Sequence, residues 1–262
     1  FRKNCIDNKI PFVTWTHGGF GLTYSLLGHD VTDFRLCKNH ISYGNYLEDL
    51  IKNDKCVLKK LDLYKDHKIL PVGSPRFDYE NSKQNSRKIL KTNNKQTVLF
   101  FMGSMVKKNH FYFGHDRQKC ETENWELHHD ILCLLKKYQN KYNIIFKDYS
   151  NGNKNLWKKI LKDIKADKIL YVSNEYKAND LLRMSSLNIV PWISTIFFEA
   201  LYFNADIFAI EDDIFDELLK DDLNDEIFYF KSEKNFLFKL DEYLKAGKFY
   251  TRNKKNSKNY FL

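Results

Sequence analysis

From Lys95 onward, the chain alternates short apolar runs with amphipathic stretches, and this alternation constrains the fold more than any other feature. Continuous apolar runs bounded by Gly, Asp or Asn are typical of strands that are buried on both faces. The stretches between them have apolar residues three or four positions apart, which predicts helices that pack one face against a sheet. This order predicts an α/β fold with a parallel sheet.

The pattern gives approximate limits for each element in this part of the chain. Strands are expected at 97–102, 143–147, 168–172, 187–190, 207–210 and 227–230. Helices are expected at 127–142, 156–164, 179–184, 195–203 and 234–244, a further segment of the unit at 214–219, and a long loop at 105–122. The first five strands are expected to form one parallel sheet.

The segment before Lys95 holds fewer elements: a strand at 10–15, a helix at 46–61 and a strand at 69–72. It is too short for a complete domain, and the sequence starts at Phe1, so we expect a missing N-terminal portion. A polar stretch from 79 is the best candidate for a linker. We therefore predict the remainder of an N-terminal α/β domain at 1–80, a linker at 81–94 and a C-terminal domain at 95–262.

Charge and cysteine content narrow the class of protein. Of 262 residues, 43 are Lys or Arg and 34 are Asp or Glu, and the net charge of +9 favours anionic partners such as phosphates, nucleic acid or acidic lipids. No apolar run approaches the roughly 20 residues that cross a bilayer. Five cysteines without a CxxC pair predict neither a disulfide framework nor a zinc site, and fit a reducing cytoplasm. The basic residues after Glu242 are expected either to touch an anionic membrane or to form a solvated chain end.

The strongest local signal is the segment 191–201, directly after the fourth expected strand of the second part. Ser194 is well placed as a helix N-cap, which leaves the following amides free for a phosphate at the positive end of the helix. The hydroxyls of Ser194 and Thr195 would add donors. Glu199, one turn into the helix, is placed to accept a hydrogen bond from a ribose hydroxyl. The alternative is an ordinary capped helix.

A second signal is the His17-Gly18-Gly19-Phe20-Gly21 segment, which follows an expected strand. Its glycines let backbone amides approach a ligand, and His17 is placed for proton transfer or phosphate contact. The spacing matches neither the dinucleotide fingerprint nor the P-loop. The alternative is a flexible turn with an incidental histidine.

Four charged residues extend these signals. Asp30 and Asp33 are candidates for a base or a nucleophile, with solvated loop carboxylates as the alternative. Arg76 lies in a tight turn that suits a phosphate or a carboxylate. Lys147 ends the strand at 143–147 and is expected at the same crevice edge.

The adjacent pair His128 and His129 lies near the start of an expected helix. Neighbouring helical residues face different directions, so the pair is not expected to bind a metal. Both residues are expected at the surface.

Taken together, these motifs resemble those of the GT-B glycosyltransferases, which have two Rossmann-like domains facing each other across a cleft. The loop at 17–21 followed by Ser42-Tyr43-Gly44 is similar to the His-Gly-Gly and aromatic-Gly pair of bacterial capsule and lipopolysaccharide transferases. The turn at 73–78 resembles the Gly-x-Pro-Arg-x-Asp element shared with CDP-glycerol glycerophosphotransferases. The stretch from Asp180 to Leu201 is similar to the donor-binding region of nucleotide-sugar transferases. The strand at 145–147 resembles one that ends in Lys-x-His-Pro, although Asp148-Tyr149-Ser150 stands here instead.

The resemblance implies a metal-independent transferase that moves a sugar from a nucleotide-activated donor to a surface polysaccharide or lipid-linked glycan. A CMP-linked acidic sugar is the favoured donor, bound as a substrate, with no cofactor. His17 with Asp30 or Asp33 would provide acid/base or nucleophilic catalysis. The implied donor-binding residues are Gly18, Gly19, Arg76, Lys147, Ser194, Thr195 and Glu199. The implied place is the cytoplasm, with peripheral contact at the inner face of the membrane.

Other functions stay open at this point. A CDP-glycerol-type glycerophosphotransferase would differ only in its donor, and a UDP-sugar epimerase would release free sugar without an acceptor. A non-catalytic remnant that binds glycan or nucleotide is a third alternative. Nucleic-acid binding is the weakest, because the lysines are scattered among acids and no recognised motif occurs.

Overall fold

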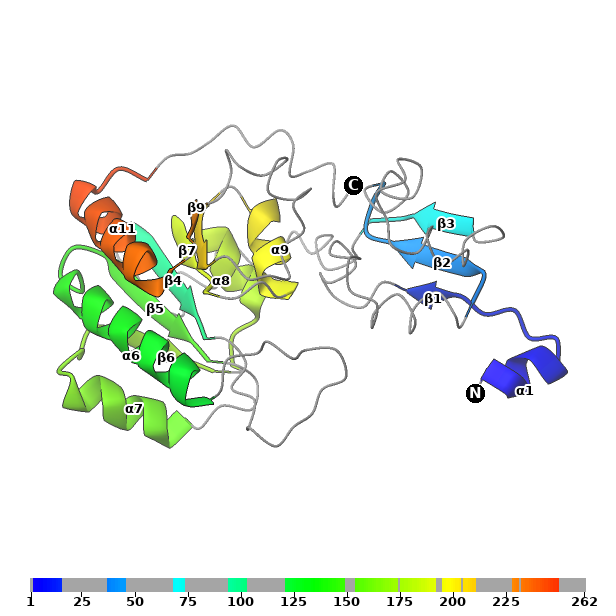
Figure 1. Ribbon diagram of the computed structural model, residues 1–262, viewed down its shortest axis with the longest axis horizontal. Helices are drawn as coiled ribbons and strands as arrows, with labels where there is room; N and C mark the ends of the chain where they lie inside the picture. Colours follow the sequence, from blue (N-terminus) through cyan, green and yellow to red (C-terminus); the bar gives the residue numbers. More distant parts are fainter. Residues whose placement is uncertain are drawn as a thin grey trace.

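The computed structural model of the chain contains two separate parallel β-sheets (Figure 1). The structure describes residues 2–15, 37–45, 68–73, 94–102, 121–148, 154–173, 175–191, 195–203, 205–210, 228–230 and 232–249. None of the helices in these segments has the length and apolar character needed to cross a membrane.

The larger sheet has six parallel strands in the order β6-β5-β4-β7-β8-β9. The strands are β4 (Thr97–Phe101), β5 (Asn143–Lys147), β6 (Leu170–Val172), β7 (Leu187–Ile189), β8 (Asp206–Ile210) and β9 (Phe228–Phe230). The chain moves outward from β4 to β6, then returns to pair β7 with the other side of β4. This reversal is the topological switch point of a doubly wound Rossmann-like sheet, where ligands bind at the carboxyl ends of the strands.

Helices cover both faces of this sheet (Figure 1). They are α6 (Glu121–Lys137), α7 (Lys154–Asp163), α8 (Ala178–Met184), α9 (Thr195–Tyr202) and α11 (Glu233–Ala246). Alternate strand residues such as Phe100, Phe146 and Ile189 point toward α6, α7 and α11 and form one core with them. Helices α8 and α9 lie on the opposite face. The strands therefore need apolar residues at nearly every position, which is why they appear as continuous apolar runs.

Aromatic rings pack together under α7 in this core. Trp157 is 1% exposed, and its ring lies 5.0 Å from that of Phe146 and 5.2 Å from that of Trp125. His128 is fully buried here, with its ring 5.6 Å from the Phe100 ring. The expectation that His128 lies at the surface is therefore wrong.

His128 is buried because it lies on the same face of α6 as several core residues. It stands three, four and seven positions before buried residues, namely Ile131, Leu132 and Leu135, so helical geometry carries it into the core. His129 is partly exposed, so the two rings do face different directions as expected.

We expect Trp157→Ala to lower the free energy of unfolding by about 3–5 kcal/mol, because it leaves a large cavity beside Phe146. Urea unfolding followed by circular dichroism measures this loss. The matched control is Leu156→Ala at the next position, where the side chain is 41% exposed and we expect a loss below about 1 kcal/mol. Equal losses in the two variants would mean that Trp157 is not a core residue.

Helix α11 is held at its end by two residues of the turn after α6. Gly247 ends the helix in the left-handed conformation, with φ 70°. Lys141 Nζ donates to the carbonyl oxygens of Leu244 and Lys245 at 2.9 Å each, and the Tyr142 hydroxyl donates to that of Leu244 at 2.7 Å. These bonds satisfy carbonyls that the helix itself leaves open.

Tyr138 adds a bond between the same two elements. Its hydroxyl donates to Asp241 Oδ1 at 3.0 Å, and burial, followed by this bond and the charge of Asp241, raises the pKa of Tyr138 to about 12. The proton is bound more tightly in the folded than in the unfolded chain. The contribution of Tyr138 to the free energy of unfolding is therefore full below pH 10 and is lost as the pH rises toward 12.

We therefore expect the wild type to lose more stability between pH 10 and 12 than Tyr138→Phe, which lacks this ionisation. Urea titrations of both proteins at steps of pH measure the two slopes. Parallel curves would show that the Tyr138 hydroxyl does not contribute to alkaline unfolding.

The smaller sheet has three parallel strands in the order β1-β2-β3, preceded by α1 (Arg2–Asp7). The strands are β1 (Thr14–Trp15), β2 (Asn39–Ser42) and β3 (Lys68–Pro71). His40 is fully buried in β2, and its Nδ1 lies 2.9 Å from Thr14 Oγ1. The Cys37 thiol donates to the carbonyl of Phe12 at 2.9 Å, which joins the start of β2 to the segment before β1.

The predicted α/β fold with a parallel sheet is confirmed, and its element limits shift by a few residues. The helix expected at 127–142 begins at Glu121, inside the expected loop, and ends at Lys137 because residues 138–142 form turns. Strand β2 and helix α1 were not predicted. The expected helix at 46–61, the segment at 214–219 and the linker at 81–94 lie outside the described residues. The domain limits stay a prediction.

Candidate functional site

The carboxyl ends of β4 and β7 define the candidate site, because the chain changes direction between these neighbours. Met102 follows β4, and Val190 and Pro191 follow β7; all three are buried. Helix α9 begins at Thr195, shortly after β7, so its N-terminus lies at this edge of the sheet.

Lys147 brings a positive charge to the same edge. It is the last residue of β5, pairs in register with Phe101 of β4, and is only 8% exposed. Its Nζ donates to the carbonyl oxygen of Asp148 at 2.8 Å. Burial lowers the pKa of Lys147, and the negative charges of Asp148 and Glu175 act in the opposite direction. An ammonium with so little solvent around it gains from an added anion.

Helix α9 supplies two side chains from one face, because Thr195 and Glu199 are four residues apart. Thr195 is half-buried in the first turn, where backbone amides without helical partners give a partial positive charge. Glu199 is 4% exposed. A hydroxyl and a carboxylate on one helix face suit a phosphate and a sugar hydroxyl respectively.

Lys147 alternates with Phe146 and therefore lies on the face of the sheet that α8 and α9 cover. Lys147 at the end of β5 and Thr195 at the start of α9 therefore lie toward the carboxyl ends of the strands, on the face of the sheet that α8 and α9 cover. Their role in a site, and that of Glu199, stays a prediction. The other predicted site residues lie outside the described residues: His17, Gly18, Gly19, Asp30, Asp33, Arg76 and Ser194.

Sequence reasoning missed a polar pair next to Lys147. Asp148 is 3% exposed and accepts a hydrogen bond from the Tyr171 hydroxyl, which joins the ends of β5 and β6. Burial, the bond to Asp148 and the charge of Asp148 raise the pKa of Tyr171. The polar residue after an apolar strand was the only signal for Asp148, and nothing in the sequence indicated its partner.

Glu175 completes this polar edge. The backbone amide of Glu175 lowers the pKa of its own carboxyl most, burial acts in the opposite direction, and the Ser173 amide, Lys154 and Lys147 lower the pKa further. Lys154 Nζ lies 3.7 Å from Glu175 Oε1. The carboxylates of Asp148 and Glu175 therefore lie near Lys147 at the carboxyl ends of β5 and β6.

We expect Tyr171→Phe to lower the free energy of unfolding by about 1–3 kcal/mol, because it removes a donor from the buried Asp148 carboxylate. Thermal and urea unfolding at pH 7 measure the loss. Tyr176→Phe is the control, since it removes the hydroxyl of a nearby, partly exposed tyrosine. A loss no larger than that of the control would contradict a structural role for the Tyr171–Asp148 bond.

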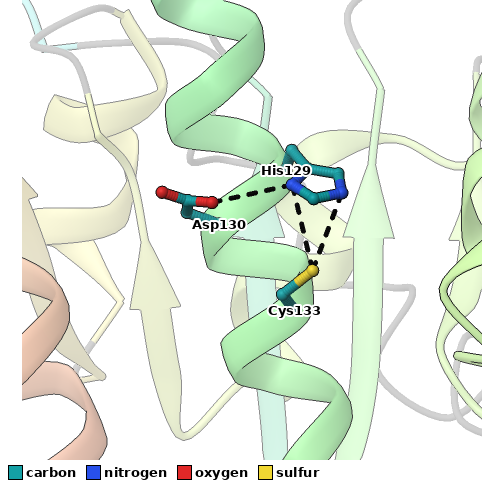
Figure 2. Close-up of polar contacts among 3 residues, drawn as sticks. All are labelled: His129, Asp130 and Cys133. Atoms are coloured by element: carbon teal, nitrogen blue, oxygen red, sulfur yellow. Dashed lines mark hydrogen bonds and ion pairs between the residues drawn. The ribbon is translucent and has the colours of Figure 1, made fainter.

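A Cys–His–Asp group on α6 has the residue types of a nucleophilic site (Figure 2). Cys133 Sγ lies 3.7 Å from His129 Nε2 and 3.9 Å from Nδ1, and His129 Nδ1 lies 3.6 Å from Asp130 Oδ1. However, burial and then the charge of Asp130 raise the pKa of the Cys133 thiol, so it stays protonated near neutral pH. This group is not an activated nucleophile.

Cysteine and metal chemistry find no further support in the described segments. Cys5, Cys37 and Cys133 are free thiols there. Within the same segments, no group of three His, Cys, Asp or Glu residues is arranged to hold a metal ion.

No protein-family model and no curated protein sequence matches this chain. Solved structures do match it in fold. MnaA of S. aureus, solved with UDP, has a TM-score of 0.61 at 11% identity over 99% of this chain and 67% of its own. A proposed UDP-N-acetylglucosamine 2-epimerase from Listeria monocytogenes has a TM-score of 0.57 at 10% identity, over 99% of this chain and 63% of its own.

WaaG, a glycosyltransferase involved in lipopolysaccharide biosynthesis, has a TM-score of 0.50 at 13% identity over 84% of this chain. This chain spans 57% of the length of WaaG. At such low identity these matches establish the fold: parallel, Rossmann-like α/β sheets, as in glycosyltransferases of the GT-B type.

Proposed function

We propose that this chain is a glycosyltransferase that binds a nucleotide-activated sugar at the β4–β7 edge. The observation that carries the proposal is the buried Lys147 at the carboxyl end of β5, the strand next to β4, on the same face of the sheet as the start of α9. A buried cation and a helix N-terminus at a switch point form an environment for phosphate groups.

Each group at this edge has a role in the proposal. The α9 amides, with the hydroxyls of Ser194 and Thr195, hold the donor phosphates, and Lys147 offsets their charge. Glu199 accepts a hydrogen bond from a ribose hydroxyl. When the sugar–phosphate bond breaks, negative charge grows on the leaving phosphate, and fixed dipoles and a cation in a site of low polarity stabilise that charge.

The rest of the proposal rests on the motif resemblance. His17 with Asp30 or Asp33 is proposed to act on the acceptor, and Gly18, Gly19 and Arg76 to line the donor side. The acceptor is a surface polysaccharide or a lipid-linked glycan. The nucleotide sugar is a substrate, and neither a resident cofactor nor a metal takes part. We place the protein in the cytoplasm, with its basic C-terminal tail touching the inner face of the membrane.

Two classes of nucleotide-sugar donor are candidates within this proposal. The net charge of +9 and the cations Lys147 and Arg76 favour a CMP-linked acidic sugar. The UDP bound to MnaA, a structure of the same fold, favours a uridine donor. The nucleotide binding experiment below separates them.

A UDP-sugar epimerase is the second candidate function, favoured by the match to the Listeria protein. Such an enzyme changes or releases its sugar without an acceptor. Incubation with UDP-sugars alone, followed by chromatography of the products, distinguishes it from a transferase, which transfers its sugar only when an acceptor is present.

We expect CMP, CDP, UDP or GDP to raise the melting temperature of the wild type, because a ligand that binds only the folded chain stabilises it. The gain is about 2.7 kcal/mol at a hundredfold excess over Kd. Calorimetric titration then gives the Kd. Lys147→Gln should weaken binding about tenfold to a hundredfold, since a charged hydrogen bond to phosphate is lost. The double variant Ser194→Ala, Thr195→Ala should weaken it as well.

The matched control is Lys158→Gln, which removes one lysine charge from the exposed side of α7. It should bind nucleotide as the wild type does, within about twofold. No stabilisation by any of the four nucleotides, or equal losses in Lys147→Gln and Lys158→Gln, would overturn the proposed donor site.

A further inference from the structure

Helix α7 carries lysines along its outward side, which we call the α7 lysine face: Lys154, Lys158, Lys159 and Lys162. The helix packs into the core through Trp157, Ile160 and Leu161, and all four lysines are exposed. Asp163 is the one acidic residue of the helix. Lys154 lies near Glu175, whereas Lys158, Lys159 and Lys162 make no ion pair with the described part of the chain.

The neighbouring helices do not share this imbalance. On α11, Lys234, Lys239 and Lys245 alternate with Glu233, Asp241 and Glu242, and Lys239 Nζ lies 2.9 Å from Glu242 Oε2. On α6, Lys137 Nζ lies 3.6 Å from Asp241 Oδ1 of α11. Lysines on those helices are balanced by acids, as on an ordinary solvated surface. Among the described residues, the four lysines of α7 stand against Asp163 alone within their helix, so the α7 lysine face is a positive patch.

The shape and composition of the patch indicate its partner. One face of a ten-residue helix, about 15 Å long, is convex and suits a flat surface better than a groove. The patch has no arginine for bidentate phosphate contacts, and the aromatic residue of α7, Trp157, is buried and cannot stack on a base. Leu156 is 41% exposed beside the lysines and adds apolar contact. Lysine ammonium groups attract the phosphates of an anionic lipid surface.

We propose that the α7 lysine face binds the anionic surface of a phospholipid membrane. The proposal does not depend on the donor site. It also differs from contact through the C-terminal tail, because it places the contact on a folded helix of the larger sheet.

The test uses cosedimentation of the full chain with vesicles of phosphatidylcholine, with and without phosphatidylglycerol. The wild type should bind only the anionic vesicles, and binding should fall as salt is raised. The triple variant K158Q/K159Q/K162Q should bind about a hundredfold more weakly, at about fivefold for each lysine. The matched control K234Q/K239Q/K245Q removes the same charge from exposed positions on α11 and should stay within about fivefold of the wild type.

Several results would overturn the proposal. Equal losses in the two triple variants would show an effect of net charge, and an unchanged K158Q/K159Q/K162Q would assign binding to another surface, such as the tail. Binding to neutral vesicles as strong as to anionic ones, or binding of duplex RNA by this face without vesicle binding, would also reject it. Circular dichroism of the variants shows whether they are folded. Thermal shifts of the variants with nucleotide show whether the proposed donor site still binds, independently of membrane binding.

Discussion

The burial of both faces of the six-stranded sheet is the constraint on which the rest of this structure depends. Parallel strands cannot be joined by tight turns, so each pair needs a crossover, and the helices of those crossovers cover the sheet. Val98, Leu99 and Phe100 of β4 are therefore all fully buried, although successive side chains point to opposite faces. Apolar packing on both sides leaves charged groups little room except where the strands end.

That constraint explains why the buried charged residues of the sheet stand at strand ends, Asp206 at the start of β8 and Lys147 at the end of β5. Lys147 and Asp148 are the first charged residues after the apolar part of β5, and both remain buried. Each has a compensating partner, the Asp148 carbonyl for Lys147 and the Tyr171 hydroxyl for Asp148. Buried charges need such partners, so these bonds hold the side chains at the ends of β5 and β6 in place.

Helix α7 is fixed on the sheet by one side and exposes the other. Trp157 fills the core against Phe146, which fixes the helix on the sheet, and this leaves its lysines on the opposite side. The stability of the helix comes from its buried side, as is usual for short helices. Substitution of its outward residues should therefore change the stability of the fold little.

The sequence by itself determined the type and order of the elements in the larger sheet. Apolar runs at Thr97–Phe101 and Asn143–Lys147 and the helical period of α7 are local signals, and the strand at 143–147 has the predicted limits. The placing of Lys147 and Thr195 at the ends of elements followed from the same patterns. Tertiary structure alone decided that His128 is buried, that Tyr171 bonds Asp148, and that β7 pairs with β4. These features join residues far apart in the chain or depend on which helix face meets the sheet, and a local pattern contains neither kind of information.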